Sequence, residues 1–81
     1  MRVLMFSTEH CVMCRQVKPM VRKVCAEKGV KLTELSAVEG NNIEKYNLRQ
    51  VPTIIILDDA GDEIQRFSGY ISEVKFRGIL E

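Results

Sequence analysis

Two cysteines stand three residues apart near the start of the chain, as Cys11 and Cys14 of the segment CVMC. A thiol at a helix N-terminus faces unpaired backbone N–H groups and the positive end of the helix dipole, and both stabilise a thiolate. Residues three apart on a helix are neighbours, so Cys14 can reach a disulfide partner held on Cys11. If a helix begins here, the spacing predicts Cys11 as a nucleophile and Cys14 as the thiol that resolves a mixed disulfide.

The pattern of apolar residues predicts the elements that would position these thiols. The run at the N-terminus lacks alternation, which is typical of a strand covered on both faces, and the run TIIIL has the strongest strand pattern in the chain. Apolar positions recur at helical spacing after Cys11, and Gly29 is a typical end for that helix. The expected order is strand Arg2–Ser7, helix Cys11–Lys28, edge strand Lys31–Leu35, short helix Asn41–Tyr46, central strand Thr53–Leu57, strand Glu63–Ser68 and helix Ser72–Leu80.

Some side chains have expected places within these elements. Cys14 continues the apolar face of the first helix, so it is expected to be more buried than Cys11. Asn41 and Ser72 are expected to cap the second and third helices. Ile64 and Phe67 are the apolar members of the last strand, and Val74, Ile79 and Leu80 are expected to face inward from the last helix.

Length, charge and composition limit the possible classes of protein. The 81 residues fit one α/β domain, residues 1–81. Twelve basic and eleven acidic residues leave a formal charge of +1, which gives no electrostatic reason to expect nucleic acid or an anionic membrane as a partner. The apolar run from Val3 to Phe6 is shorter than the core of a secretory signal, and no segment reaches membrane-spanning length. We therefore expect a cytoplasmic protein, and nothing in the sequence demands more than a monomer.

A C-x-x-C pair is also found in metal sites. A closed zinc site needs four ligands, whereas His10 with the two cysteines supplies three, and the chain has no second pair. Copper carriers place C-x-x-C after a first strand, but in a ferredoxin-like order of strands and helices that this chain lacks. We expect no metal and no bound cofactor, and a metal carrier remains the rival interpretation from another class.

The sequence resembles thioredoxin-like and glutaredoxin-like redoxins over nearly all its length. The resemblance is carried by the strand VLMF, the motif CVMC, Pro19 within the first helix, VPT before a strand, the following hairpin and Gly69. It implies a minimal thioredoxin fold, βαβαββα, with a four-stranded mixed sheet in the order 2-1-3-4 and three helices. It also implies a thiol–disulfide oxidoreductase that reduces protein disulfides through Cys11 and Cys14 without a cofactor.

The same resemblance implies a substrate-binding segment. Val51-Pro52-Thr53 is similar to the cis-proline loop of the family, so the bond before Pro52 is expected to be cis and to lie beside the disulfide. The backbone of Val51 would then pair with an extended substrate segment. Gly69 matches the glycine after the last strand, where a side chain would crowd the substrate groove; a simple turn glycine is the alternative.

The chain departs from the family pattern around the motif. Met5 stands where thioredoxins usually have a buried carboxylate, so the base that activates Cys14 is unassigned. Glu9 is either that base or an exposed loop carboxylate. His10 replaces a tryptophan, and it either stabilises the Cys11 thiolate when protonated or makes no specific contact.

Two further points concern the residues between the cysteines and the third thiol. Val12 and Met13 replace the Gly-Pro or Pro-Tyr that is common in the family, so no potential carries over. Cys25 is eleven residues beyond Cys14, about 16 Å along a helix, and is expected to be a core residue with no part in a disulfide.

The resemblance leaves the reductant open. The expected partners are disulfide-containing proteins and a thioredoxin reductase or similar reductant. The short chain and the S-G-Y sequence after the last strand also resemble glutaredoxin-like electron donors to ribonucleotide reductase. A glutathione-dependent protein fits less well, because Gly69-Tyr70-Ile71 replaces the expected pair of glycines and acidic residue.

Overall fold

Four strands form one mixed sheet in the computed structural model, which describes residues 1–81. The sheet order is β2-β1-β3-β4, with β1 parallel to β2 and antiparallel to β3, and with β3 antiparallel to β4. This confirms the predicted order 2-1-3-4 and the edge position of β2. The elements are β1 (Arg2–Ser7), α1 (Val12–Lys28), β2 (Lys31–Ser36), α2 (Asn42–Lys45), β3 (Thr53–Leu57), β4 (Glu63–Ser68) and α3 (Glu73–Leu80).

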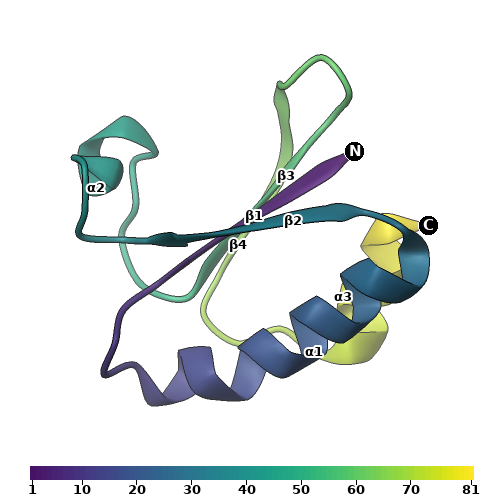
Figure 1. Ribbon diagram of the computed structural model, residues 1–81, viewed down its shortest axis with the longest axis horizontal. Coiled ribbons are helices and arrows are strands. Elements are labelled where there is room, and N and C mark those ends of the chain that lie inside the picture. The colour runs from purple at the N-terminus through teal and green to yellow at the C-terminus, as the bar shows by residue number, and fades with distance from the viewer.

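The two central strands are buried on both faces, as their unbroken apolar runs predict. On one face, α1 and α3 cover the sheet side by side, whereas α2 stands at one end of the molecule (Figure 1). The core beneath α1 and α3 consists of Val3, Met5, Val17, Val21, Val24, Cys25, Ile54, Ile56, Ile71, Phe76 and Leu80. A smaller core on the other face consists of Leu4, Phe6, Ala37, Leu48 and Ile55.

The ends of α1 follow from local sequence. Cys11 is the N-cap residue, with extended backbone, so the helix begins one residue later than predicted. Gly29 ends the helix in the left-handed conformation at φ 68°, where its N–H bonds back to Ala26 and Cys25. Pro19 lies inside the helix on its exposed side. The helix therefore begins at the reactive pair.

The interior face of α3 differs from the prediction. Ser72 caps the helix as expected, by accepting a hydrogen bond from the Lys75 N–H. Val74, however, is 84% exposed, while Phe76 is fully buried together with Leu80. Since residues two apart point to nearly opposite sides of a helix, a core that takes Phe76 leaves Val74 in solvent.

The start of α2 and the edge strand β4 show details that the sequence did not indicate. Asn41 is the N-cap residue of α2, as expected, but it has φ 60° and its side chain makes no capping hydrogen bond. Instead, the amide of Asn42 donates to the carbonyl oxygen of Ser36, 2.7 Å away, and so fixes the helix to the end of β2. Ile64 is exposed because no helix covers its side of the edge strand β4, whereas Phe67 packs against the larger core.

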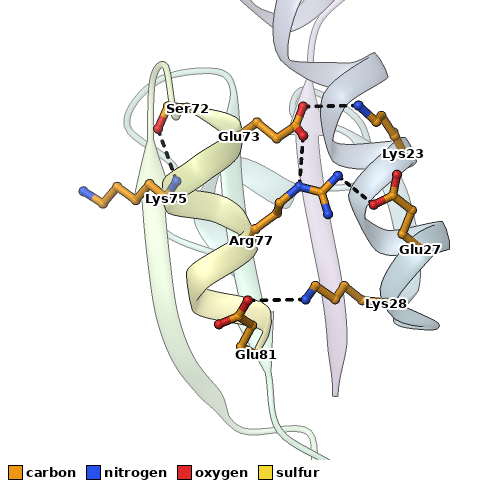
Figure 2. A network of polar contacts seen from close by, with 8 residues as sticks. All are labelled: Lys23, Glu27, Lys28, Ser72, Glu73, Lys75, Arg77 and Glu81. Carbon is orange, nitrogen blue, oxygen red and sulfur yellow. Dashed lines mark hydrogen bonds and ion pairs between the residues drawn. The ribbon is translucent and has the colours of Figure 1, made fainter.

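Ion pairs join the outer surfaces of α1 and α3, as Figure 2 shows. Arg77 of α3 binds Glu27 of α1 at 2.6 Å and Glu73 of its own helix at 2.9 Å, and Lys23 of α1 lies 3.6 Å from Glu73. Lys28 and Glu81 form a further pair near the end of α3, at 3.6 Å. None of the three helices is both long and apolar enough to cross a lipid bilayer.

Candidate active site

Cys11 and Cys14 are joined by a disulfide at the start of α1. Their Cα atoms lie 5.2 Å apart, within the normal range for a disulfide. The Cys14 N–H points at the Cys11 sulfur, 3.1 Å away, so the sulfur occupies the position of a helix-capping oxygen. No acidic residue lies in the first turn of α1, so the positive end of the helix dipole is not offset by a carboxylate there.

The two cysteines differ in access to solvent. Cys14 is 1% exposed whereas Cys11 is partly exposed, which is the difference that the sequence predicts. Val12 and Met13 between them are exposed, and so is His10. An incoming disulfide can therefore reach Cys11 but not Cys14, and the exposed apolar side chains lie where a partner would approach.

The segment before β3 reaches the same end of the sheet as the reactive pair. Phe6, next to the end of β1, pairs with Thr53 at the start of β3. The Val51–Pro52 bond is cis, and Thr53 Oγ1 donates to the Gln50 carbonyl oxygen at 2.6 Å, which closes the turn. Neither the N–H nor the C=O of Val51 takes part in a hydrogen bond, so both are free to pair with another chain.

Gly69 is hydrogen-bonded to this turn. Its N–H donates to the Pro52 carbonyl oxygen at 2.8 Å, which brings the end of β4 against the cis-proline segment. Gly69 has φ 87°, and a Cβ built on it would lie 2.8 Å from Nε2 of Gln50. The structure thus brings Cys11 and Cys14 together at the start of α1. It brings Val51, Pro52, Thr53 and Gly69 together at the start of β3.

A hollow of about 250 Å³ lies beside Val51 and is mostly apolar. Its lining, called the apolar hollow below, consists of Thr8, Ala37, Val38, Ile43, Leu48, Arg49, Gln50 and Val51. Val38 and Ile43 are exposed on its rim. An apolar side chain next to a substrate disulfide would find contacts here.

No carboxylate is buried near Cys14. Ser7 and Thr53 are the only polar residues in the buried set, and Met5 is wholly enclosed in the larger core. Glu9 is exposed, as the loop alternative proposed. The base for Cys14 is therefore not supplied by a buried acid of this chain.

The third thiol, Cys25, lies in the core beneath α1 and forms no disulfide. Burial raises its pKa from 9.0 to about 11, because the thiolate would lose its hydration. Cys25 is thus protonated and enclosed at neutral pH. No group of three or more His, Cys, Asp or Glu side chains is arranged to hold a metal ion.

Sequence reasoning missed Gln50 and the apolar hollow. Gln50 precedes the VPT segment, but nothing in its type indicates that its side chain lies over Gly69. The hollow is assembled from three separate segments, so only the tertiary fold brings its lining together.

Comparison with known proteins finds a matching family and several solved structures of similar fold. A family model described as a thioredoxin-like domain matches residues 2–81. Thioredoxin 1 of Thermosipho africanus is similar with a TM-score of 0.86 and 23% identity, covering 96% of this chain and 88% of that one. A thioredoxin of Fasciola hepatica has a TM-score of 0.83 and 29% identity, covering 96% of this chain and 75% of that one. Thioredoxin O2 of Arabidopsis thaliana in the oxidised state has a TM-score of 0.83 and 23% identity, covering 98% and 70%.

Proposed function

Because this chain belongs to the family of thioredoxin-like domains and carries that fold's paired cysteines, which mark it as a thiol–disulfide oxidoreductase, we propose that it reduces disulfides of other proteins. The observation that carries the proposal is the contrast in access between the two thiols at the start of α1. Cys11 is open to a partner, and Cys14 is enclosed one helical turn away.

The reaction proceeds by two thiol–disulfide exchanges. The Cys11 thiolate attacks a sulfur of the substrate disulfide, a mixed disulfide forms, and the first substrate sulfur leaves as a thiolate that takes up a proton. The Cys14 thiolate then attacks the Cys11 sulfur, which releases the second substrate thiolate. Two electrons have moved to the substrate, and Cys11 and Cys14 are left as the disulfide seen here.

The surroundings of Cys11 support the first step. The Cys14 N–H that points at the Cys11 sulfur would donate to the thiolate of the reduced protein, and the helix dipole adds to this stabilisation. The unpaired backbone of Val51 supports the positioning of an extended substrate segment beside the sulfur. Exposed Val12 and Met13, with the apolar hollow, would contact its side chains.

The proposal needs a reductant that restores the dithiol. We propose a thioredoxin reductase, acting on a monomer in the cytoplasm, since the structural neighbours are thioredoxins. The glutaredoxin-like alternative, with electrons passed to ribonucleotide reductase, is favoured by Tyr70, which is exposed directly after Gly69. Recycling by glutathione and glutathione reductase as fast as by thioredoxin reductase would contradict the first choice.

Insulin reduction coupled to NADPH and thioredoxin reductase tests the proposal. The wild-type protein is expected to turn over, and both Cys11→Ser and Cys14→Ser are expected to abolish multiple turnovers. Cys25→Ala is the matched control, because it removes the third thiol and leaves Cys11 and Cys14 in place. Loss of activity in all three variants to the same extent would contradict the assignment to Cys11 and Cys14.

The metal-carrier alternative has a separate readout. Two thiolates at the start of α1 are the ligands it would use, and no third His, Cys, Asp or Glu lies in reach of them. Protein purified under reducing conditions with one equivalent of zinc or copper, released when the two thiols are alkylated, would favour the carrier over the oxidoreductase.

A further inference from the structure

The side chain of Gln50 reaches from the cis-proline turn to the end of β4. Its Nε2 atom lies 2.8 Å from the point that a Cβ on Gly69 would occupy, and no other atom outside residues 68 to 70 comes within 4 Å of that point. The carboxamide nitrogen is therefore the end of Gln50 that is turned towards Gly69, and the oxygen faces away from it. The space left by the missing side chain of Gly69 is filled by this carboxamide alone.

Gln50 is fixed through its backbone and free at its side chain. Its carbonyl oxygen accepts a hydrogen bond from Thr53 Oγ1 at 2.6 Å, and this is the only hydrogen bond that Gln50 makes. The side chain is exposed and its carboxamide has no partner within the chain. The next residue, Val51, has an unpaired backbone N–H and C=O. Gln50 and Val51 thus each offer one donor group and one acceptor group at neighbouring positions.

These groups match the main chain of an extended peptide. Val51 can exchange both of its hydrogen bonds with one residue of an added strand. The side chain of Gln50 projects from the same turn, so it meets that strand beyond the residue that pairs with Val51. A carboxamide has the same donor and acceptor chemistry as a peptide group, so it can bond to a main chain of any sequence.

We propose that Gln50 is a positioning residue for the substrate, and that its carboxamide oxygen accepts a hydrogen bond from a main-chain N–H of the segment that carries the disulfide. This inference rests on the proposed function. It assigns disulfides within extended peptides as the preferred substrate class. A small disulfide without neighbouring peptide groups offers Gln50 no partner, so Gln50 contributes nothing to its reduction.

The first test compares two substrates, a disulfide-bonded peptide and bis(2-hydroxyethyl) disulfide. In Gln50→Ala, kcat/KM for the peptide is expected to fall about three- to tenfold, the effect of losing one hydrogen bond, and the change should lie mainly in KM. The rate with bis(2-hydroxyethyl) disulfide should stay at the wild-type value. Gln65→Ala is the matched control, because Gln65 is an exposed glutamine of β4 that pairs with Ile56, away from the cis-proline turn. It should change neither rate.

The second test removes the partner of Gln50 from the substrate. In a set of peptides, the amide bonds around the cysteine are replaced one at a time by ester bonds, which lack the N–H. The wild-type protein is expected to lose kcat/KM with the esters that remove the partners of Val51 and of Gln50. In Gln50→Ala one of these losses should disappear and the loss due to Val51 should remain, a pattern that a merely damaged protein would not give.

Several outcomes overturn the inference and leave the proposed function intact. They are an unchanged kcat/KM for the peptide in Gln50→Ala, an equal fall for both disulfides, a fall of the same size in Gln65→Ala, and an ester pattern in Gln50→Ala that equals that of wild type. If the wild-type protein reduces neither disulfide, the proposed function fails as well.

Discussion

The guanidinium of Arg66 in β4 donates a hydrogen bond to the carbonyl oxygen of Tyr46, 2.7 Å away and 20 positions earlier in the chain. The same nitrogen lies 3.2 Å from the Asn47 carbonyl oxygen, and the other two guanidinium nitrogens bind Glu63 at 2.7 and 2.9 Å. The ring of Tyr46 packs on Phe6 of β1, with centroids 4.7 Å apart. Arg66 thus fixes the end of α2 from the far edge of the sheet, shortly before the chain enters the cis-proline segment.

Replacing Arg66 by alanine is expected to lower the free energy of unfolding by about 1 to 2 kcal/mol, since the two carbonyl groups lose a charged donor that is partly shielded from solvent. Urea denaturation measures the loss. Glu63→Gln is the control, because it keeps the contacts to Tyr46 and Asn47 and removes only the exposed ion pair. If the two variants were equally unstable, the carbonyl contacts would contribute nothing.

Gly69→Ala is expected to lower stability by about 1 to 3 kcal/mol and to raise KM for protein substrates, because φ 87° strains any residue with a Cβ. The second contact, with Gln50 Nε2, involves the end of a flexible side chain that can move aside. The double variant Gly69→Ala/Gln50→Ala should therefore remain as unstable as the single one. Full recovery in the double variant, measured by thermal unfolding, would assign the loss to crowding instead.

Cys25 is expected to make the oxidised protein less stable at alkaline pH. Its pKa is raised to about 11 in the folded state against 9.0 in the unfolded chain, so the stability it contributes is complete below pH 9.0 and is lost as pH rises towards 11. The full loss is about 3 kcal/mol at most. In the oxidised protein Cys11 and Cys14 do not titrate. Denaturation at about pH 8 and about pH 10.5 should therefore show a smaller decline for Cys25→Ala than for wild type.

Arg77→Met is expected to lower Tm at low ionic strength, because Arg77 is the residue that joins Glu27 of α1 to Glu73 of α3 (Figure 2). The side chains of these three residues are between 30% and 46% exposed, so salt should screen their charges and reduce the difference from wild type. A double-mutant cycle with Glu27→Gln isolates the contact between the helices. A Tm difference that stays constant up to about 1 M NaCl would indicate lost packing of the arginine stem in place of lost charge.

The positions of the strands and the reactive pair were predictable because each depends on local pattern, whereas the order of the strands in the sheet was implied by the family resemblance. The run TIIIL can only be a buried strand, and the spacing of Cys11 and Cys14 has meaning as soon as a helix begins there. The interior face of α3 was harder to predict, since Val74 and Phe76 are both apolar. Only the position of the helix against α1 selects Phe76 for the core.

The parts of the site other than the two cysteines could not be predicted without the tertiary fold. Gln50 and Gly69 are 19 residues apart, and their contact depends on the pairing of β3 with β4. Such contacts cannot be predicted from the pattern of residue types along the chain.

Each open edge of the sheet carries an arginine–glutamate pair held by two hydrogen bonds: Arg22 with Glu34 on β2, and Arg66 with Glu63 on β4. The pairing of β3 with β4 is also interrupted by an irregularity at Ile56 and Leu57. A strand from another molecule that added to either edge would have to displace charged groups from water. The fold therefore resists strand-by-strand aggregation at both edges, which would allow a domain with such apolar central strands to accumulate at high concentration without forming fibrils.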